Sequence, residues 1–258
     1  MTHHTFLSFL RALAQRPFWV AGWNILLRFR RPLDVLTRYV FGRGEYPERF
    51  RVRTPIGEQE VTAYSYHDLL TVVECFGKLD YRVPRDISSV VDVGANIGIS
   101  ALYFLTRNPR VRVVRYEPVA DNVARLRKTL EGLEDRYRVE QVAVGPEAGT
   151  ATFAQEATGR YGGLVTDRYV AEHGLEGVRT TTVPVVGINE VVRTAAEEWG
   201  RVELLKLDVE WLEEELIRAL TPQSLARIHR IYAESEFSDD LAGYRRSRYG
   251  SIVRFIRE

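Results

Sequence analysis

The hydrophobic positions of the chain change their spacing near residue 86. Beyond it, short apolar runs such as "ISSVVDVGA" and "RVRVVRYEP" predict strands, and the amphipathic segments "ISALYFLTRN" and "DNVARLRKTL" predict helices. Asp121 is the expected N-cap of the second helix. Further strands are expected in "YRVEQVAVG", "RVELLKLDVE" and "ARIHRIYAES", and a further helix in "EEELIRAL". This alternation predicts an α/β fold with a doubly wound, mostly parallel sheet, which binds ligands at the carboxyl ends of its strands.

Two regions depart from this alternation. Residues 147–182 are rich in glycine, so we expect loops there with at most one short strand. Residues 1–63 form a basic, aromatic extension, which we expect to be helical and distinct from the main domain at 64–258. Its helical spacing is clearest at Phe6, Leu7, Leu10 and Leu13. This extension could pack against the main domain or a second subunit as a homo-oligomer contact, or attach peripherally to anionic lipid.

Composition limits the possible functions. The chain has 258 residues, of which 45% are hydrophobic and 28% charged, enough for one good core and a small appended subdomain. A net charge of +1 argues against bulk nucleic-acid binding. The single cysteine, Cys75, is expected to be buried and excludes an internal disulfide. With no membrane-spanning run and no secretion signal in sight, we expect a cytoplasmic protein.

The stretch "VVDVGANIGIS" joins a buried strand directly to a polar turn. Asp92 lies near the strand end, Gly94 and Gly98 permit a tight turn, and the next helix offers free N–H groups to an anion. About twenty residues later, Glu117 ends the second strand, where a carboxylate can bind the hydroxyls of a ribose. Together they predict a nucleotide-like ligand. The spacing G-A-N-I-G, with Asn96 at its centre, disfavours a dinucleotide, and a nucleotide-dependent oxidoreductase remains the first alternative.

The strand in "RVELLKLDVE" carries three charges where a central parallel strand is normally apolar. Regular alternation would place Lys206, Asp208 and Glu210 on one face. A compensated Lys–Asp ion pair is one interpretation, and the favoured one is an active site with Asp208 and Glu210 as the catalytic residues. We expect no metal, although a carboxylate pair could hold Mg²⁺ or Ca²⁺.

The motifs "VDVGANIGISALYF", "YEPVADN", "VAVG" and "LLKLDVEWLEEEL" resemble, in this order, those of the FkbM family of S-adenosylmethionine-dependent methyltransferases, over residues 64–236. The resemblance implies a class I methyltransferase (Rossmann-like) fold, S-adenosyl-L-methionine as cofactor, and O-methylation of a small molecule, natural product or glycan. The cofactor contacts that it implies are Asp92, Gly94, Ala95, Asn96, Gly98, Glu117, Asn122, Ala143, Val144 and Asp208.

The resembling family carries the pattern Asp-x-Glu-Gly-x-Glu, which Asp208, Glu210 and Glu213 match while Trp211 replaces the glycine. The Trp211 ring could stack on a substrate or narrow the access to the site, or it could mark lost activity. A cofactor-binding but inactive partner protein is therefore the second alternative. The segment before the first strand and the glycine-rich loop 157–163 are further candidates for substrate contact. The lid candidates in that segment are Tyr66, His67, Glu74 and Tyr81.

Overall fold

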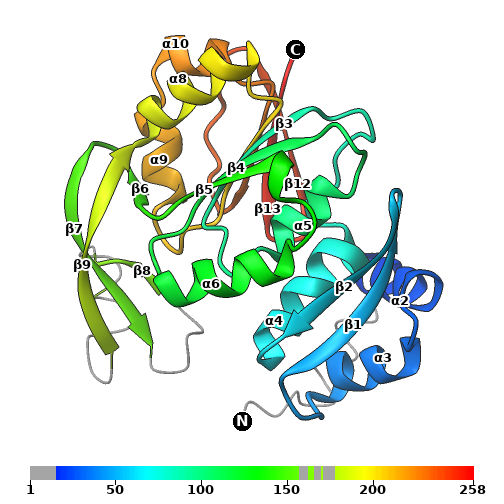
Figure 1. The fold of residues 1–258 in the computed structure, drawn as a ribbon. Helices are drawn as coiled ribbons and strands as arrows, with labels where there is room; N and C mark the ends of the chain where they lie inside the picture. The colour runs from blue at the N-terminus through cyan, green and yellow to red at the C-terminus, as the bar shows by residue number, and fades with distance from the viewer. Residues whose placement is uncertain (1–15, 157–161, 166–169, 171–177) are drawn as a thin grey trace.

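The computed structural model describes residues 16–156, 162–165, 170 and 178–258 (Figure 1). The expected helix at residues 6–13 and residues 157–161 of the glycine-rich loop lie outside the described residues. None of the described helices is long and apolar enough to cross a membrane. Cys75 is buried, as its apolar character predicted.

The fold is organised around a seven-stranded sheet. Its strands are β3 (Ser89–Val93), β4 (Arg112–Tyr116), β5 (Tyr137–Glu140), β10 (Leu204–Leu207), β11 (Arg230–Glu234), β12 (Tyr244–Tyr249) and β13 (Ile252–Arg257). Their order is β12-β13-β11-β10-β3-β4-β5, in which β11 to β5 are parallel and β13 and β12 are antiparallel additions. The predicted doubly wound, mostly parallel sheet is confirmed. Successive strands are added from β3 toward β5 on one side of the sheet and from β10 toward β11 on the other. The topological switch point therefore lies between β3 and β10.

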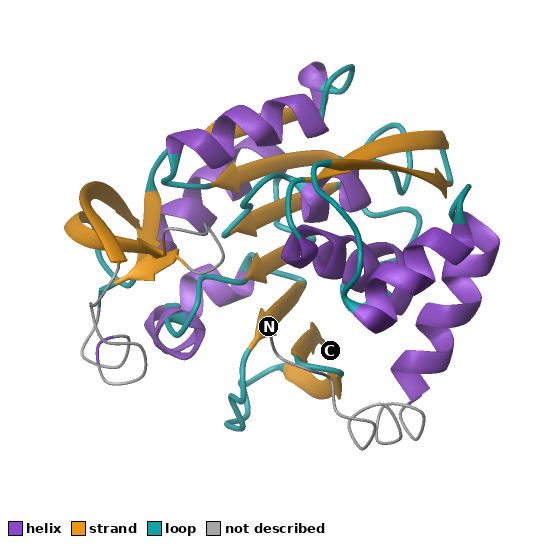
Figure 2. Ribbon diagram, turned by 90° about the horizontal axis from the view of Figure 1, so that it is seen from below, coloured by secondary structure: helices purple, strands orange, loops and turns teal. Residues whose placement is uncertain are grey.

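Helices cover both faces of this sheet (Figure 2). They are α5 (Ile99–Leu105), α6 (Ala120–Thr129), α8 (Ile188–Trp199), α9 (Glu213–Ala219) and α10 (Pro222–Ala226), with a short 3₁₀ turn at Glu134–Arg136. Val90 packs in the cluster that contains α5, whereas Val91 and Val93 pack in the cluster that contains α8 and α9. Alternate side chains of one strand therefore enter two separate cores, as a central strand requires.

The predicted N-cap Asp121 is wrong. Helix α6 starts at Ala120 with Val119 as its N-cap residue, and Asp121 lies in its first turn. The reason is that the carboxylate of Glu117 accepts a hydrogen bond from the Val119 N–H, so Glu117 and not Asp121 binds the free N–H at the helix start.

Residues 147–182 contain more strand than expected. A second sheet has the order β6-β9-β7-β8. Its strands are β6 (Ala143–Gly145), β7 (Gly149–Glu156), β8 (Gly162–Leu164) and β9 (Val178–Gly187). Strands β7 and β9 pair antiparallel along the whole of β7, so non-local hydrogen bonding outweighs the local glycine content. The expected single strand "YRVEQVAVG" is likewise split between the two sheets, as β5 and β6.

In the described part of the N-terminal extension, the helices end at residue 41. Helices α2 (Arg16–Arg28) and α3 (Pro32–Phe41) precede an antiparallel hairpin of β1 (Glu48–Thr54) and β2 (Gly57–Ala63). The alternating burial along β1 shows the two-residue period of a strand, which the expectation of a helical extension overlooked. Helix α4 (Tyr66–Val72) and a π-helix at Val73–Lys78 lead into the main sheet.

The described part of the extension packs against the main domain. Ile25 of α2 and Val52 of β1 belong to the same hydrophobic cluster as Leu102 of α5. This packing neither establishes nor excludes a domain boundary, so the division after residue 63 stays a prediction. The outer faces of α2 and α3 are unusually apolar, because six of the seven large hydrophobic side chains exposed in the described part lie there. They are Trp19, Trp23, Leu26, Leu27, Leu33 and Phe41.

Candidate active site

The turn after β3 is shaped by close packing against β10. Gly94 has a φ of 77°, and a Cβ atom on it would lie 1.7 Å from the carbonyl oxygen of Asp208. Only glycine fits this position. Asn96 follows with a φ of 45°, and Gly98 begins helix α5 beside Leu126. The turn thus brings Asn96 to the carboxyl edge of the sheet.

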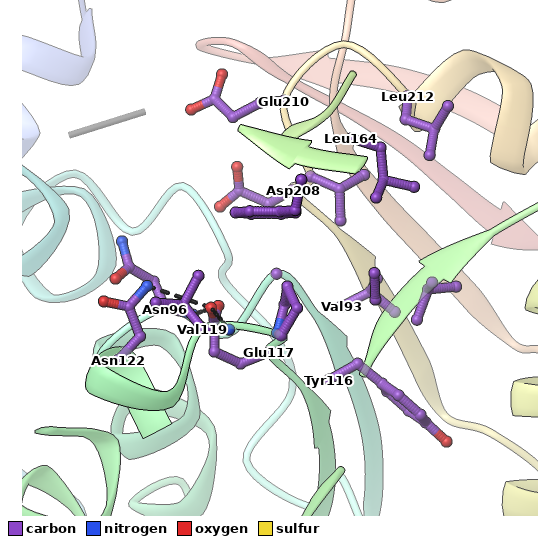
Figure 3. A pocket seen from close by; sticks show the side chains of 16 residues that line it. Val93, Asn96, Tyr116, Glu117, Val119, Asn122, Leu164, Asp208, Glu210 and Leu212 are labelled. Atoms are coloured by element: carbon purple, nitrogen blue, oxygen red, sulfur yellow. Dashed lines mark hydrogen bonds between the residues drawn. The ribbon is translucent and has the colours of Figure 1, made fainter. Parts of the chain in front are cut away.

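Glu117, at the end of β4, connects three segments around this edge. Its Oε2 accepts a hydrogen bond from the Asn96 N–H at 2.9 Å, and its Oε1 accepts from the Val119 N–H at 3.0 Å and the Asn122 amide at 3.2 Å (Figure 3). Glu117 is 5% exposed, and its burial raises its pKa while these hydrogen bonds act in the opposite direction. Because Oε2 accepts one bond here, it retains a lone pair for a ligand hydroxyl.

A cavity opens beside Glu117 at the switch point (Figure 3). Its polar lining includes Asn96, Glu117, Asn122 and Asp208, and much of the remaining lining is apolar. The apolar lining includes Val119, Ala143, Val144, Phe153, Leu164 and Leu212. An apolar slot with a hydroxyl-binding carboxylate at one end suits a flat base attached to a ribose. These residues therefore fit the cofactor that the sequence motifs imply.

Phe153 and Leu164 were not predicted from the sequence. They come from β7 and β8, opposite one another in register, in the region expected to be loops. The polar–apolar alternation from Thr150 to Phe153 in "GTATFAQE" was the signal available for β7. Their position over the cavity depends on the second sheet, which local patterns did not predict.

Three predicted contact residues do not line this cavity. Asp92 lies behind it, where its Oδ2 accepts a hydrogen bond from Ser100 Oγ at 2.7 Å. Ala95 lines a neighbouring cavity, and Gly98 is the N-cap residue of α5, packed on Leu126. Their contribution is therefore to hold the turn that carries Asn96.

Lys206 lies between two carboxylates. Its Nζ is 2.9 Å from Asp92 Oδ1 and 3.2 Å from Asp208 Oδ2, and it donates a hydrogen bond to the Gly94 carbonyl oxygen. Burial disfavours the ammonium, but the two carboxylates outweigh this effect and raise the pKa of Lys206. The Lys–Asp ion pair that the sequence suggested exists, and one of its partners, Asp208, also lines the cavity.

Asp208 and Glu210 line both this cavity and a neighbouring one of about 310 Å³. The regular alternation expected for Lys206, Asp208 and Glu210 is wrong, because β10 ends at Leu207 and Glu210 has a φ of 53°. Asp208 is 31% exposed and accepts a hydrogen bond from the Tyr81 hydroxyl at 3.2 Å. The turn after β10, and not the alternation of a strand, therefore places the Asp208 and Glu210 carboxylates at the same two cavities.

The neighbouring cavity contains three of the four lid candidates. His67, Glu74 and Tyr81 line it, whereas the Tyr66 hydroxyl donates to the Tyr39 carbonyl oxygen away from it. Glu234, at the end of β11, also lines it and was missed from the sequence. The available signal was its place at the end of a parallel strand, at the same sheet edge as Asp208.

Several carboxyl groups around this cavity hold protons unusually tightly. Burial, followed by repulsion from Asp80 and Asp208, raises the pKa of Glu74 to about 7. Burial and repulsion from Asp208 and Glu74 raise the pKa of Glu234 to about 7. Groups that titrate near neutral pH beside a cavity can accept or return a proton during a reaction.

Trp211 occupies the backbone conformation of a glycine. Its φ is 74°, in the left-handed region that costs about 1–2 kcal/mol for a residue with a side chain. The position where the resembling family has glycine therefore retains the glycine-like backbone. Trp211 lines a third cavity together with Asp208, Glu210 and Glu234, and these three carboxyl residues also line the neighbouring cavity.

Comparisons with known proteins identify the family of the chain. Residues 92–258 match the family model described as the methyltransferase FkbM domain. The chain is 32% identical over 206 residues to the AMB antimetabolite synthetase AmbE of Pseudomonas aeruginosa, covering 67% of this chain and 9% of that protein. It is 29% identical over 184 residues to the 31-O-demethyl-FK506 methyltransferase FkbM of Streptomyces tacrolimicus, covering 62% of this chain and 69% of that protein. The chain thus spans only a small part of AmbE. A solved methyltransferase from Geobacter sulfurreducens aligns with a TM-score of 0.36 and 13% identity, covering 74% of this chain and 78% of that one.

Proposed function

The chain belongs to the FkbM family of S-adenosylmethionine-dependent methyltransferases, and we propose that it methylates a hydroxyl oxygen of a small molecule, natural product or glycan. The observation that carries the proposal is that Asp208 and Glu210 line both the cofactor cavity and the neighbouring one. A methyl acceptor must lie within reach of both spaces. One relative is a 31-O-demethyl-FK506 methyltransferase, a name that indicates methylation of an oxygen, and this supports the acceptor class.

Cofactor binding is assigned to the edge formed by β3 and β4. Glu117 accepts hydrogen bonds from the ribose hydroxyls, and Asn96 and Asn122 fix the orientation of its carboxylate. The apolar wall of Val144, Phe153 and Leu164 excludes water from the adenine side. S-adenosylmethionine supplies a methyl group that its sulfonium has already activated. The protein therefore has to orient the acceptor oxygen and manage its proton.

Asp208 is the residue assigned to the acceptor hydroxyl. Its Oδ2 already accepts a hydrogen bond from Tyr81 and faces Lys206, so its orientation is fixed before an acceptor arrives. Glu210, Glu74 and Glu234 line the same cavity and can take the proton onward. The raised pKa values of Glu74 and Glu234, about 7, match a proton acceptor that works near neutral pH.

The experiment measures formation of S-adenosylhomocysteine with a panel of acceptors that present a hydroxyl, a carboxylate or an amine. Turnover with hydroxyl acceptors alone supports O-methylation of this class, and turnover with amines alone contradicts it. Calorimetry with S-adenosylhomocysteine and with NAD(H) distinguishes a methyltransferase from the oxidoreductase alternative, which requires binding of NAD(H). If S-adenosylhomocysteine binds and no acceptor is methylated, the inactive partner protein is favoured.

A further inference from the structure

A further cavity lies apart from the candidate active site and shares no lining residue with it. Its volume is about 840 Å³. The end of α2, the tip of the β1–β2 hairpin, the segment before β3, the end of α5 and the start of β11 form its walls. No acidic residue lines it, whereas six arginines do. They are Arg28, Arg53, Arg82, Arg85, Arg107 and Arg230.

Most of these charges have no carboxylate partner in the part of the chain that the structure describes. Arg230 forms an ion pair of 3.2 Å with Glu203. The other five form no ion pair with a carboxylate among the described residues. Several guanidinium groups around one space repel each other, and this repulsion is reduced when an anion enters.

Arg107 is the arginine of this cavity with a buried N–H group that has no acceptor among the described residues. It is 8% exposed, its Nε donates to the Tyr103 carbonyl oxygen, and its guanidinium lies 4.0 Å from the centre of the Tyr103 ring. Its buried Nη2 has no hydrogen-bond partner among the described residues. Burial and the positive charges of Arg28 and Arg85 lower the pKa of Arg107. A guanidinium that is largely buried without a carboxylate partner costs free energy, and an anion bound nearby would reduce this cost.

We propose that this cavity binds the phosphate group of a ligand. Guanidinium groups match the geometry of phosphate oxygens and can each donate two parallel hydrogen bonds to them. Arg82 and Arg85 are exposed, whereas Arg107 is buried. A phosphate in the cavity would offset the charges of the exposed pair and reduce the cost of the unpaired Arg107 charge.

Two sources can supply this phosphate. Arg28 is the last residue of α2, whose exposed face carries Trp19, Trp23 and Leu27. Aromatic and aliphatic side chains next to arginines are typical of surfaces that touch anionic lipid, so a lipid headgroup is one source. A soluble phosphorylated molecule is the other.

Calorimetry and thermal unfolding with inorganic pyrophosphate test the site itself. We expect pyrophosphate to bind and to raise the melting temperature of the wild type, with weaker binding at higher NaCl. The double variant Arg82→Gln/Arg85→Gln, at two exposed positions, should bind pyrophosphate about tenfold or more weakly. The control Arg127→Gln/Lys128→Gln removes the same charge from exposed positions of α6 outside the cavity and should bind like the wild type.

Vesicle sedimentation separates the two sources. Binding to phosphatidylglycerol vesicles but not phosphatidylcholine vesicles, lost in Arg82→Gln/Arg85→Gln and retained in the control, supports the site with a lipid headgroup as ligand. Pyrophosphate binding without vesicle binding supports it with a soluble ligand. The proposal is overturned if neither probe binds the wild type, or if the control variant loses binding as much as the cavity variant does.

Discussion

Lys206 and Asp92 form an ion pair of 2.9 Å between neighbouring strands β10 and β3, with both side chains almost completely buried. The two residues are directly opposite in the parallel register. Lys206 contacts the more exposed Asp208 at the same time. The Lys206 ammonium therefore keeps a buried carboxylate partner when Asp208 is substituted. An effect on catalysis at Asp208 can thus be measured without leaving a buried charge unpaired.

Asp208→Asn should lower turnover about a hundredfold while leaving affinity for S-adenosylhomocysteine within about twofold, because the amide keeps the shape and loses the charge. Lys206 retains Asp92, so we expect little change in melting temperature. Steady-state methyl transfer, calorimetry and thermal unfolding on one preparation measure all three. Glu215→Gln, at an exposed position of α9, is the matched control. Near-normal turnover of Asp208→Asn would contradict its assignment and favour Glu210.

Glu117→Gln should weaken binding of S-adenosylhomocysteine by about tenfold or more, because hydrogen bonds to a charged acceptor are roughly twice as strong as neutral ones. The amide oxygen can still accept from Val119 or Asn96, so the fold should persist. Calorimetry measures the affinity. Glu140→Gln, at the end of the adjacent strand β5 and paired with Arg138, should bind normally. Equal affinities in both variants would remove Glu117 from the site.

The variants Trp211→Gly and Trp211→Phe distinguish the effect of the aromatic ring from that of the backbone conformation at this position. If the ring contacts the acceptor, KM for the acceptor should rise up to about tenfold in the glycine variant and stay near the wild-type value in the phenylalanine variant. Cofactor affinity should be unchanged, because Trp211 does not line the cofactor cavity. Wild-type kinetics in the glycine variant would show that the ring has no part in acceptor binding.

The pH dependence of stability should include a contribution from Glu213. Burial, followed by repulsion from Asp208 and Glu234, raises the pKa of Glu213 to about 7, and its Oε1 accepts from the Val209 N–H. The folded state then binds the proton more tightly than the unfolded state, so stability falls as pH rises from about 4.5 to 7. Glu213→Gln keeps an acceptor for Val209 and should raise the free energy of unfolding by on the order of 1–3 kcal/mol at pH 8.

At pH 4 the same Glu213→Gln variant should nearly match the wild type, since the carboxyl is then mostly protonated in both states. Urea unfolding at the two pH values measures the difference. A gain of equal size at both pH values would show that the proton of Glu213 is not responsible.

Ile25→Ala tests whether α2 folds with the methyltransferase core. Ile25 is fully buried in the cluster that contains α5, so the variant should lose about 2–4 kcal/mol of stability in a single transition. Leu26→Ala, at the adjacent exposed position, should change stability by less than about 0.5 kcal/mol. Thermal and urea unfolding of both variants measure this. A separate low-stability transition in Ile25→Ala would instead support an independent extension ending near residue 63.

The amino-acid sequence by itself determined the parts of this protein that depend on local patterns. The β-branched run at residues 90–93 and the glycine turn after it predicted β3 and its turn, because strand period and tight-turn chemistry are properties of neighbouring residues. Glu117 could be located in the same way, since the length of one strand–helix–strand unit fixes its distance from the turn.

Tertiary structure alone decided which distant segments meet. Phe153 and Leu164 reach the cavity beside Glu117 through a second sheet whose pairing is non-local. Glu74 and Glu234 line one cavity with Asp208 only because the π-helix at Val73–Lys78 and the end of β11 lie beside the end of β10. The arginine-lined cavity likewise joins residues from Arg28 to Arg230. Burial, pKa and the unmet hydrogen bond of Arg107 all depend on surroundings that sequence neighbours do not supply, which is why local patterns could not predict them.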